Sequence, residues 1–144
     1  MKFAAAWVLG SRQAAPVNAP VADAISPAVD VTLRAGDGVR LAGTYWPGRQ
    51  ADAPAVLLLH GISCSVLEWE HNIAALATQH RVIALDLLGC GLSDKPLDAD
   101  YDMLSQAKFV FAFMDTMGLN TVSMVGNSMG GCIALECAAM HPER

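Results

Sequence analysis

The stretch that decides the fold is "TVSMVGNSMGGCIALECAAM", residues 121–140. It begins with a short apolar run, passes through a serine enclosed by glycines, and continues into a longer apolar run. Glycines stand two positions before and two positions after Ser128, and Gly131 follows directly. A chain needs glycine where two backbones approach closely or where a turn requires a positive φ. The pattern therefore predicts a crowded turn between a strand and a helix.

Two earlier apolar runs also lead into glycine-bearing loops. "AVLLL" (55–59) precedes "HGIS", and "RVIALD" (81–86) precedes "LLGCGLSD". Short continuous apolar runs like these, and "TVSMV" (121–125), are typical of strands buried on both faces. Since sites in parallel sheets form at the carboxyl ends of the strands, we expect the chemistry to lie in these loops.

Segments with helical spacing lie between these runs. Apolar residues recur every three or four positions in residues 65–80 and 103–119. Ahead of them, "VDVTLR" and "VRLAGTYW" flank "AGDG", which is typical of an antiparallel hairpin. The alternation predicts an α/β fold, a mostly parallel sheet with helices on both faces. The apolar positions that set the helical spacing are Val66, Trp69, Ile73, Leu76 and Ala77, then Leu104, Ala107, Phe111, Met114 and Met117.

Residues 126–130, Gly-Asn-Ser-Met-Gly, fit the G-x-S-x-G nucleophile elbow. In this turn the serine occupies a strained conformation and projects its hydroxyl into the site. We therefore expect Ser128 to be the nucleophile, with Gly126 and Gly130 as the elbow glycines. A Walker-type phosphate loop is excluded because no lysine follows Gly131. A dinucleotide fingerprint is excluded because "GCGLSD" (89–94) ends in aspartate rather than glycine.

An oxyanion hole is expected beside the elbow. In this architecture one donor is the backbone N–H of the residue after the nucleophile, and another comes from the loop after an earlier strand. Here these donors are the N–H groups of Met129 and Ile62. Each would stabilise a tetrahedral intermediate by roughly 3 kcal/mol.

The motifs "AVLLLHGISCS", "EW", "RVIALDLLGCGLSDKP", "VGNSMGG" and "HPER" occur in an order that resembles the alpha/beta-hydrolase fold family. The resemblance covers Val29 to Arg144. It implies a mostly parallel eight-stranded sheet, no cofactor, and a strand ending at His60 that lies between those ending near Asp86 and Val125. The serine at the elbow disfavours the relatives that use aspartate, which are the haloalkane dehalogenases and epoxide hydrolases.

In the family the acid and the histidine of the triad follow the nucleophile on later loops. Only 16 residues follow Ser128, so we expect the chain to be the N-terminal part of one hydrolase domain, truncated after the elbow helix and inactive alone. His60 is expected to shape the loop before Ile62, Asp86 to serve its own loop, and Trp69 to pack in the core. His71, His80 and His141 lie on or beside predicted helices and are poor candidates for the base.

For the complete protein we expect a serine hydrolase that cleaves a carboxylic ester through an acyl-enzyme. Its partner would be a small-molecule substrate with a hydrolysable carbonyl. One alternative is a carbon–carbon bond hydrolase of ring-cleavage products, suggested by Asn127, although "HGISCS" lacks the glycine-rich loop usual among those enzymes. The alternative from another class is a non-catalytic, truncated product or pseudo-hydrolase.

The composition of the chain argues against several other classes of function. The chain has 144 residues, is 53% hydrophobic and 16% charged, and carries a net charge of -5. Without a basic cluster it is not expected to bind nucleic acid, and no apolar stretch reaches the ~20 residues of a membrane span. The four cysteines lack C-x-x-C spacing, so neither a zinc site nor another metal site is expected.

The N-terminus differs from the rest of the chain. Residues 1–28 are rich in Ala, Val and Pro and show no sustained period. They indicate a leader or disordered tail, with residues 29–144 forming the hydrolase part. If these residues are a disordered tail, we expect a cytoplasmic protein. If they are a signal peptide, the protein would be secreted, but the apolar stretch Phe3–Leu9 is short for such a peptide.

Overall fold

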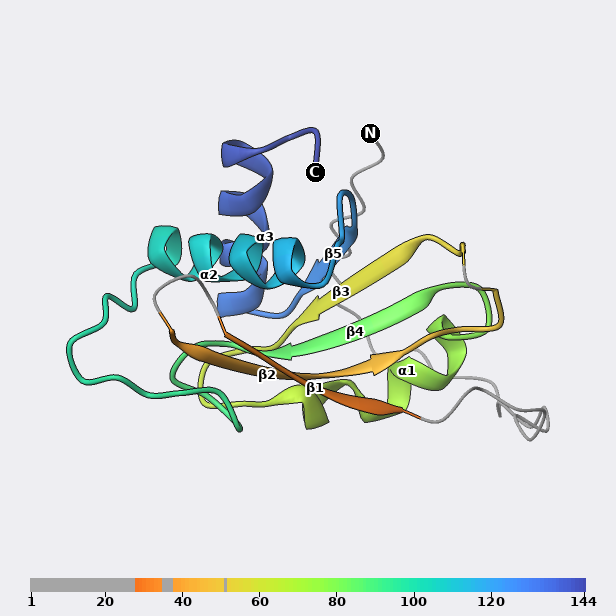
Figure 1. Cartoon of the computed structure of the whole chain (residues 1–144), viewed down its shortest axis with the longest axis horizontal. Coiled ribbons are helices and arrows are strands. Elements are labelled where there is room, and N and C mark those ends of the chain that lie inside the picture. Colours follow the sequence, from red (N-terminus) through yellow and green to blue (C-terminus); the bar gives the residue numbers. More distant parts are fainter. Residues whose placement is uncertain (1–27, 35–37, 51) are drawn as a thin grey trace, which may run out of the picture.

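The computed structural model describes residues 28–34, 38–50 and 52–144. The leader or tail expected over residues 1–28 lies outside the described residues except for Ala28, and so does the expected turn over residues 35–38 except for Gly38. The described strands form one five-stranded sheet of order β1-β2-β4-β3-β5 (Figure 1). This order places β3 between β4 and β5, as the family resemblance implied.

The sheet is antiparallel at one edge and parallel at the other. β1 (Val29–Arg34) pairs antiparallel with β2 (Arg40–Trp46), and β2 pairs antiparallel with β4 (Arg81–Asp86). β3 (Ala55–Leu59) pairs parallel with β4 on one side and with β5 (Ser123–Gly126) on the other. The carboxyl ends of β3, β4 and β5 therefore open onto the same edge of the sheet.

Helices cover both faces of the sheet, which confirms the predicted α/β class. The 3₁₀ helix η1 (Val66–Trp69) and α1 (Glu70–Leu76) lie on one face, and α2 (Met103–Thr116) and α3 (Met129–Met140) lie on the other (Figure 1). Because successive strand residues point to opposite faces, β3 contributes Leu57 and Leu59 to the core under α2 and α3. Val56 and Leu58 join the smaller cluster under α1.

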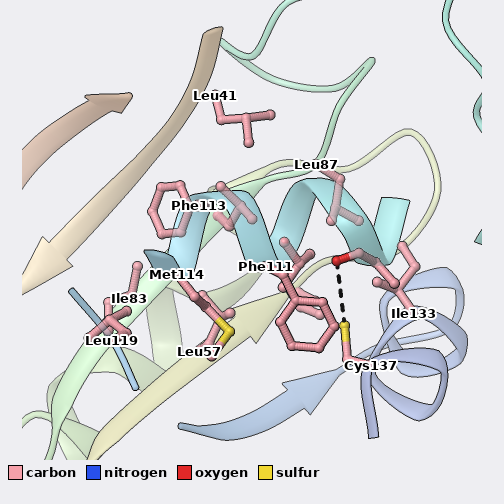
Figure 2. Close-up of a cluster of buried hydrophobic side chains, with 14 of the residues drawn as sticks. Leu41, Leu57, Ile83, Leu87, Phe111, Phe113, Met114, Leu119, Ile133 and Cys137 are labelled. Atoms are coloured by element: carbon pink, nitrogen blue, oxygen red, sulfur yellow. Dashed lines mark hydrogen bonds between the residues drawn. The ribbon is translucent and has the colours of Figure 1, made fainter. Parts of the chain in front are cut away.

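The larger core explains why α2 and α3 pack side by side. Figure 2 shows Phe111, Phe113 and Met114 of α2 packed with Leu57 and Ile83 of the sheet, all of them buried. Ile133 and Cys137 of α3 complete the contact, and the Cys137 thiol lies 4.0 Å from the carbonyl oxygen of Ala107. Burying each large apolar side chain stabilises the fold by roughly 2 kcal/mol, so this cluster holds α3 against α2 and the sheet.

Three local predictions need correction. Residues 65–80 form two short helices instead of one, because Ser65 caps η1 by accepting from the N–H of Leu67 at 3.4 Å and α1 starts separately at Glu70. Leu104, predicted to lie on the apolar side of its helix, is 42% exposed. It lies in the first turn of α2 and is not among the buried residues that face the sheet and α3. β5 is only partly buried, with Val125 37% exposed, because β5 is the edge strand of the described sheet.

The described residues contain neither a membrane-spanning helix nor a cluster of metal ligands. None of the described helices combines the length and the apolar character that crossing a bilayer requires. Nowhere in the described part of the chain do three or more His, Cys, Asp or Glu side chains gather as metal ligands would.

Candidate active site

Ser128 occupies the turn between β5 and α3. Its backbone angles are φ 49° and ψ -112°, and Ser128 and Ser63 are the two described non-glycine residues with positive φ. Such a conformation costs an L-residue roughly 1–3 kcal/mol and is most often retained at functional sites. The Ser128 residue is exposed, and its side chain makes no capping hydrogen bond to α3.

The elbow glycines are required by close approach of backbones. A Cβ added at Gly126 would lie 2.3 Å from the carbonyl oxygen of Gly130, and one added at Gly130 would lie 2.1 Å from the carbonyl oxygen of Leu59. Neither separation is compatible with a side chain. Within the turn, the N–H of Asn127 donates a hydrogen bond to the carbonyl oxygen of Leu59 at 3.0 Å. The start of α3 is therefore pressed against the end of β3.

The loop after β3 lies beside the elbow. A Cβ added at Gly61 would lie 3.6 Å from the Cβ of Ser128 and 3.3 Å from Nδ2 of Asn127. The backbone N–H groups of Ile62 and Met129 donate no hydrogen bond to any residue that the structure describes. Both N–H groups are therefore able to donate a hydrogen bond to an acceptor that is not one of the described residues.

His60 joins two of the loops from inside the protein. Its ring is fully buried, Nε2 accepts from the N–H of Leu87 at 3.0 Å, and Nδ1 lies 2.7 Å from the carbonyl oxygen of Gly61. Because Nε2 is the acceptor, Nδ1 carries the proton and donates to Gly61. This bonding agrees with the prediction that His60 shapes the loop and is not the base.

Asp86 holds the neighbouring loops, as expected. Its buried carboxylate accepts from the N–H of Val66 and from the N–H of Leu92, both at 2.8 Å. Gly91 is necessary beside it, since an added Cβ would lie 2.1 Å from that carboxylate. Both oxygens of Asp86 are therefore engaged in holding backbone.

None of the four histidines contacts Ser128 in this structure, and all four lie among the described residues. Each ring has other partners. His71 pairs with Glu70 at 3.2 Å, His80 Nδ1 lies 3.3 Å from the carbonyl oxygen of Leu76, and His141 packs edge-on against Phe111 with Nδ1 3.1 Å from Glu143, while His60 is bonded as above.

Sequence reasoning missed Glu68. Its Oε2 accepts from the N–H of Gly61 at 2.7 Å, and its Oε1 accepts from Nδ2 of Asn127. A signal was present, because Ser65 and Glu68 form the S-x-x-E pattern of a capping box, in which the glutamate turns back to the N-cap N–H. Here the carboxylate instead reaches out of η1 to the elbow, a direction that only the tertiary arrangement decides.

Cys90 does not compete as a nucleophile near these loops. Burial raises the pKa of its thiol above the ordinary value, and the backbone N–H of Ser63 offsets this only in part. Since the thiolate is the reactive form, Cys90 is protonated at neutral pH.

Known proteins are similar to this chain in sequence and in fold. The 2-hydroxymuconate semialdehyde hydrolase of Pseudomonas sp. strain CF600 is 37% identical over 92 residues, which cover 62% of this chain and 32% of that protein. The haloalkane dehalogenase of Mesorhizobium japonicum is 37% identical over 94 residues, covering 65% of this chain and 30% of that protein. The crystal structure of Cfl2 from Burkholderia cenocepacia superposes with a TM-score of 0.76 at 29% identity, covering 83% of this chain and 39% of that one.

The chain spans between 26% and 37% of the length of the curated relatives that it matches. The sequence pattern of the alpha/beta hydrolase fold matches residues 54–144, which is more than half of the chain. The matched region contains the β3 loop, the β4 loop and the elbow described above. The chain belongs to the alpha/beta hydrolase fold family.

Proposed function

We propose that this chain carries the nucleophile of a serine hydrolase that cleaves carboxylic esters through an acyl-enzyme. The observation that carries the proposal is the left-handed turn at Ser128, held beside Gly61 by glycines that leave no room for a side chain. The hydrolases among its relatives support the general class of reaction.

The chemistry would proceed in two steps. Ser128 Oγ forms a bond to the ester carbonyl carbon as its proton passes to a histidine base, and the alkoxide then leaves with that proton. Water next attacks the acyl-enzyme and releases the acid. During both steps the free N–H groups of Ile62 and Met129 would donate to the oxyanion.

A fluorophosphonate probe tests the nucleophile. In a form of the protein that continues past Arg144 to the length of its relatives, we expect peptide mass spectrometry to find the label on Ser128 alone. Ser128→Ala should abolish labelling and p-nitrophenyl acetate hydrolysis together. Labelling at Ser63, Ser65 or Ser93, or hydrolysis that survives in the alanine variant, would contradict the proposal.

The 144-residue chain alone gives a second test. Because each histidine ring is engaged away from Ser128, we expect no hydrolysis that depends on Ser128. If hydrolysis appears and is lost in Ser128→Ala, one of the four histidines serves as the base after all.

A carbon–carbon bond hydrolase is the second candidate. Asn127 precedes the nucleophile, and a 2-hydroxymuconate semialdehyde hydrolase is among the relatives. Turnover of a dienoate ring-cleavage product at a higher kcat/KM than any p-nitrophenyl ester would favour it. A folded full-length protein that turns over neither substrate would favour the non-catalytic alternative.

A further inference from the structure

The Glu68 carboxylate lies between two segments of the site that are far apart in the sequence, and Glu68 itself is 59 positions from Asn127. Its two oxygens are shared between the N–H of Gly61, in the loop after β3, and the side-chain amide of Asn127, in the elbow. Glu68 itself comes from η1, so three separate elements meet at one carboxylate.

These groups lie directly against the nucleophile. A Cβ added at Gly61 would be 3.3 Å from Asn127 Nδ2, 3.6 Å from Ser128 Cβ and 3.7 Å from Glu68 Oε2. Gly61 is buried and Glu68 is half-buried, so the carboxylate is not a freely solvated surface charge.

Packing alone does not hold the loop after β3. Ile62 is 70% exposed, and Ser63 has φ 58°, so neither residue is fixed by a surrounding core. The backbone of Gly61 has the conformational freedom of a residue without Cβ. Hydrogen bonds therefore orient Gly61 on both sides. Its carbonyl oxygen, in the same peptide as the Ile62 N–H, accepts from His60 Nδ1 at 2.7 Å and from the N–H of Cys64 at 3.2 Å, and Glu68 holds its N–H.

Only a carboxylate fits between these two donors. Gly61 N–H and Asn127 Nδ2 both require an acceptor, and a carboxylate offers two acceptor oxygens whereas the amide of glutamine offers one. A negative charge close to a developing oxyanion opposes catalysis, so its presence needs a geometric reason. Holding both donors at once supplies that reason.

We propose that Glu68 is a positioning residue that sets the spacing between the N–H groups of Ile62 and Met129. It does so by holding Gly61, the residue before Ile62, and Asn127, the residue before Ser128. The inference rests on the proposed function, because spacing these donors matters only if they stabilise an oxyanion. Preorganised donors act without reorganising during the reaction, so a small displacement lowers the rate.

Amide NMR of the ¹⁵N-labelled chain tests the geometry without any activity. In the wild type, the Gly61 N–H and the Asn127 side-chain amide both donate to the Glu68 carboxylate, so their signals report on that contact. Glu68→Gln should change both signals and shift the amide signals of Ile62 and Met129. Unchanged Ile62 and Met129 signals in Glu68→Gln would overturn the proposal.

Glu70→Gln is the matched control. Glu70 lies two residues further along, its side chain is 62% exposed, and its partner is the exposed His71. This variant should leave the signals of Gly61, Ile62 and Met129 as in the wild type. If it moves them as much as Glu68→Gln does, the effect belongs to the helix and not to the Glu68 carboxylate.

A reciprocal variant separates positioning from a general loss of folding. In Glu68→Gln with Asn127→Asp, the new amide can accept from Gly61 and donate to the new carboxylate. This restores the hydrogen bond from Gly61 in its original direction and the one between positions 68 and 127 with donor and acceptor exchanged. The Gly61 and Ile62 signals should return toward their wild-type positions. Failure of this double variant to recover them, in a chain that remains folded, would count against the proposal.

Kinetics of the form extended past Arg144 test the consequence. Glu68→Gln should lower kcat for p-nitrophenyl acetate by about 10-fold to 100-fold with little change in KM, since only the transition state uses the oxyanion donors. A raised KM with unchanged kcat, or no change in either, would overturn the proposed role. Activity that persists in Ser128→Ala would instead refute the proposed function, and the NMR result on Glu68 would remain separate from it.

Discussion

Gly130 and Gly131 are adjacent, yet their surroundings differ. A Cβ at Gly130 would lie 2.1 Å from the Leu59 carbonyl oxygen, whereas one at Gly131 would lie 3.3 Å from the Gly126 carbonyl oxygen. A Cβ at Gly130 would force α3 away from β3. A Cβ at Gly131 would need its neighbouring atoms to shift by only a few tenths of an ångström. Gly130 is therefore the residue whose missing side chain sets the distance between helix and strand.

We expect Gly130→Ala to lower the free energy of unfolding by about 3 kcal/mol, a large overpacking effect. Gly131→Ala should cost much less, because alanine also gains about 1 kcal/mol over glycine inside a helix. Chemical denaturation of the two variants measures the difference. Equal losses would show that α3 can move away from β3 without penalty.

The strain at Ser128 predicts a gain in stability when it is relieved. Ser128→Gly should raise the free energy of unfolding by about 1 kcal/mol, because glycine adopts a positive φ at little cost. Ser128→Ala keeps the Cβ, so its stability should stay close to that of the wild type. A destabilised glycine variant, measured in the same denaturant series, would argue against a strained turn.

At the scale of elements, the N-cap residue of α2 is Asp102, whose side chain is a titratable carboxyl group. The Asp102 carboxylate accepts from the N–H of Ser105 at 2.7 Å, and this backbone hydrogen bond, assisted by the Ser105 side chain, lowers the pKa of the carboxyl group. A lowered folded-state pKa contributes stability that is present above the unfolded-state value, about 3.9, and is lost as the pH falls through the folded-state value.

Asp102→Asn should therefore flatten the acid side of the stability profile, because asparagine can also cap a helix but does not titrate there. The measurement is the free energy of unfolding as a function of pH below about 5. Asp100→Asn, an exposed position two residues earlier, should keep the wild-type profile. A profile for Asp102→Asn that matches the wild type would rule out the cap as a source of acid sensitivity.

At the scale of the whole molecule, Cys137 reports on opening of the core. It is 2% exposed under α2, and burial, assisted by the neighbouring Glu136 charge, raises the pKa of its thiol to about 11. Cys132 lies on the same helix and is exposed. The two thiols therefore differ in access to reagents, although they share α3.

We expect iodoacetamide to modify Cys132 in the native chain and to leave Cys137 unmodified until the core unfolds. Peptide mass spectrometry across a denaturant series should place Cys137 alkylation at the global unfolding transition. Alkylation of both cysteines at similar rates in native buffer would mean that α3 separates from α2 by a local opening.

The sequence alone determined the local structure wherever one physical signal dominated. Continuous apolar runs correctly gave the bounds of β3 and β4, because a strand buried on both faces has no polar position to interrupt it. The helical spacing over residues 103–119 and the apolar run after the glycine-rich turn also predict helices, and α2 and α3 lie there. The glycine pattern around Ser128 predicted a crowded turn, and the positive φ confirms its strained conformation.

Tertiary structure decided what depends on residues far apart in the chain. Whether Val125 is buried depends on β5 lying at the edge of the described sheet, and local sequence carries no information on neighbours. The start of η1 is held not only by its Ser65 cap but also by long-range contacts, of Val66 with Asp86 at the end of β4 and of Glu68 with Gly61 after β3. The role of Glu68 is the clearest case. Its side chain could cap its own helix or reach Asn127, and the outcome depends on folding that brings together two residues 59 positions apart.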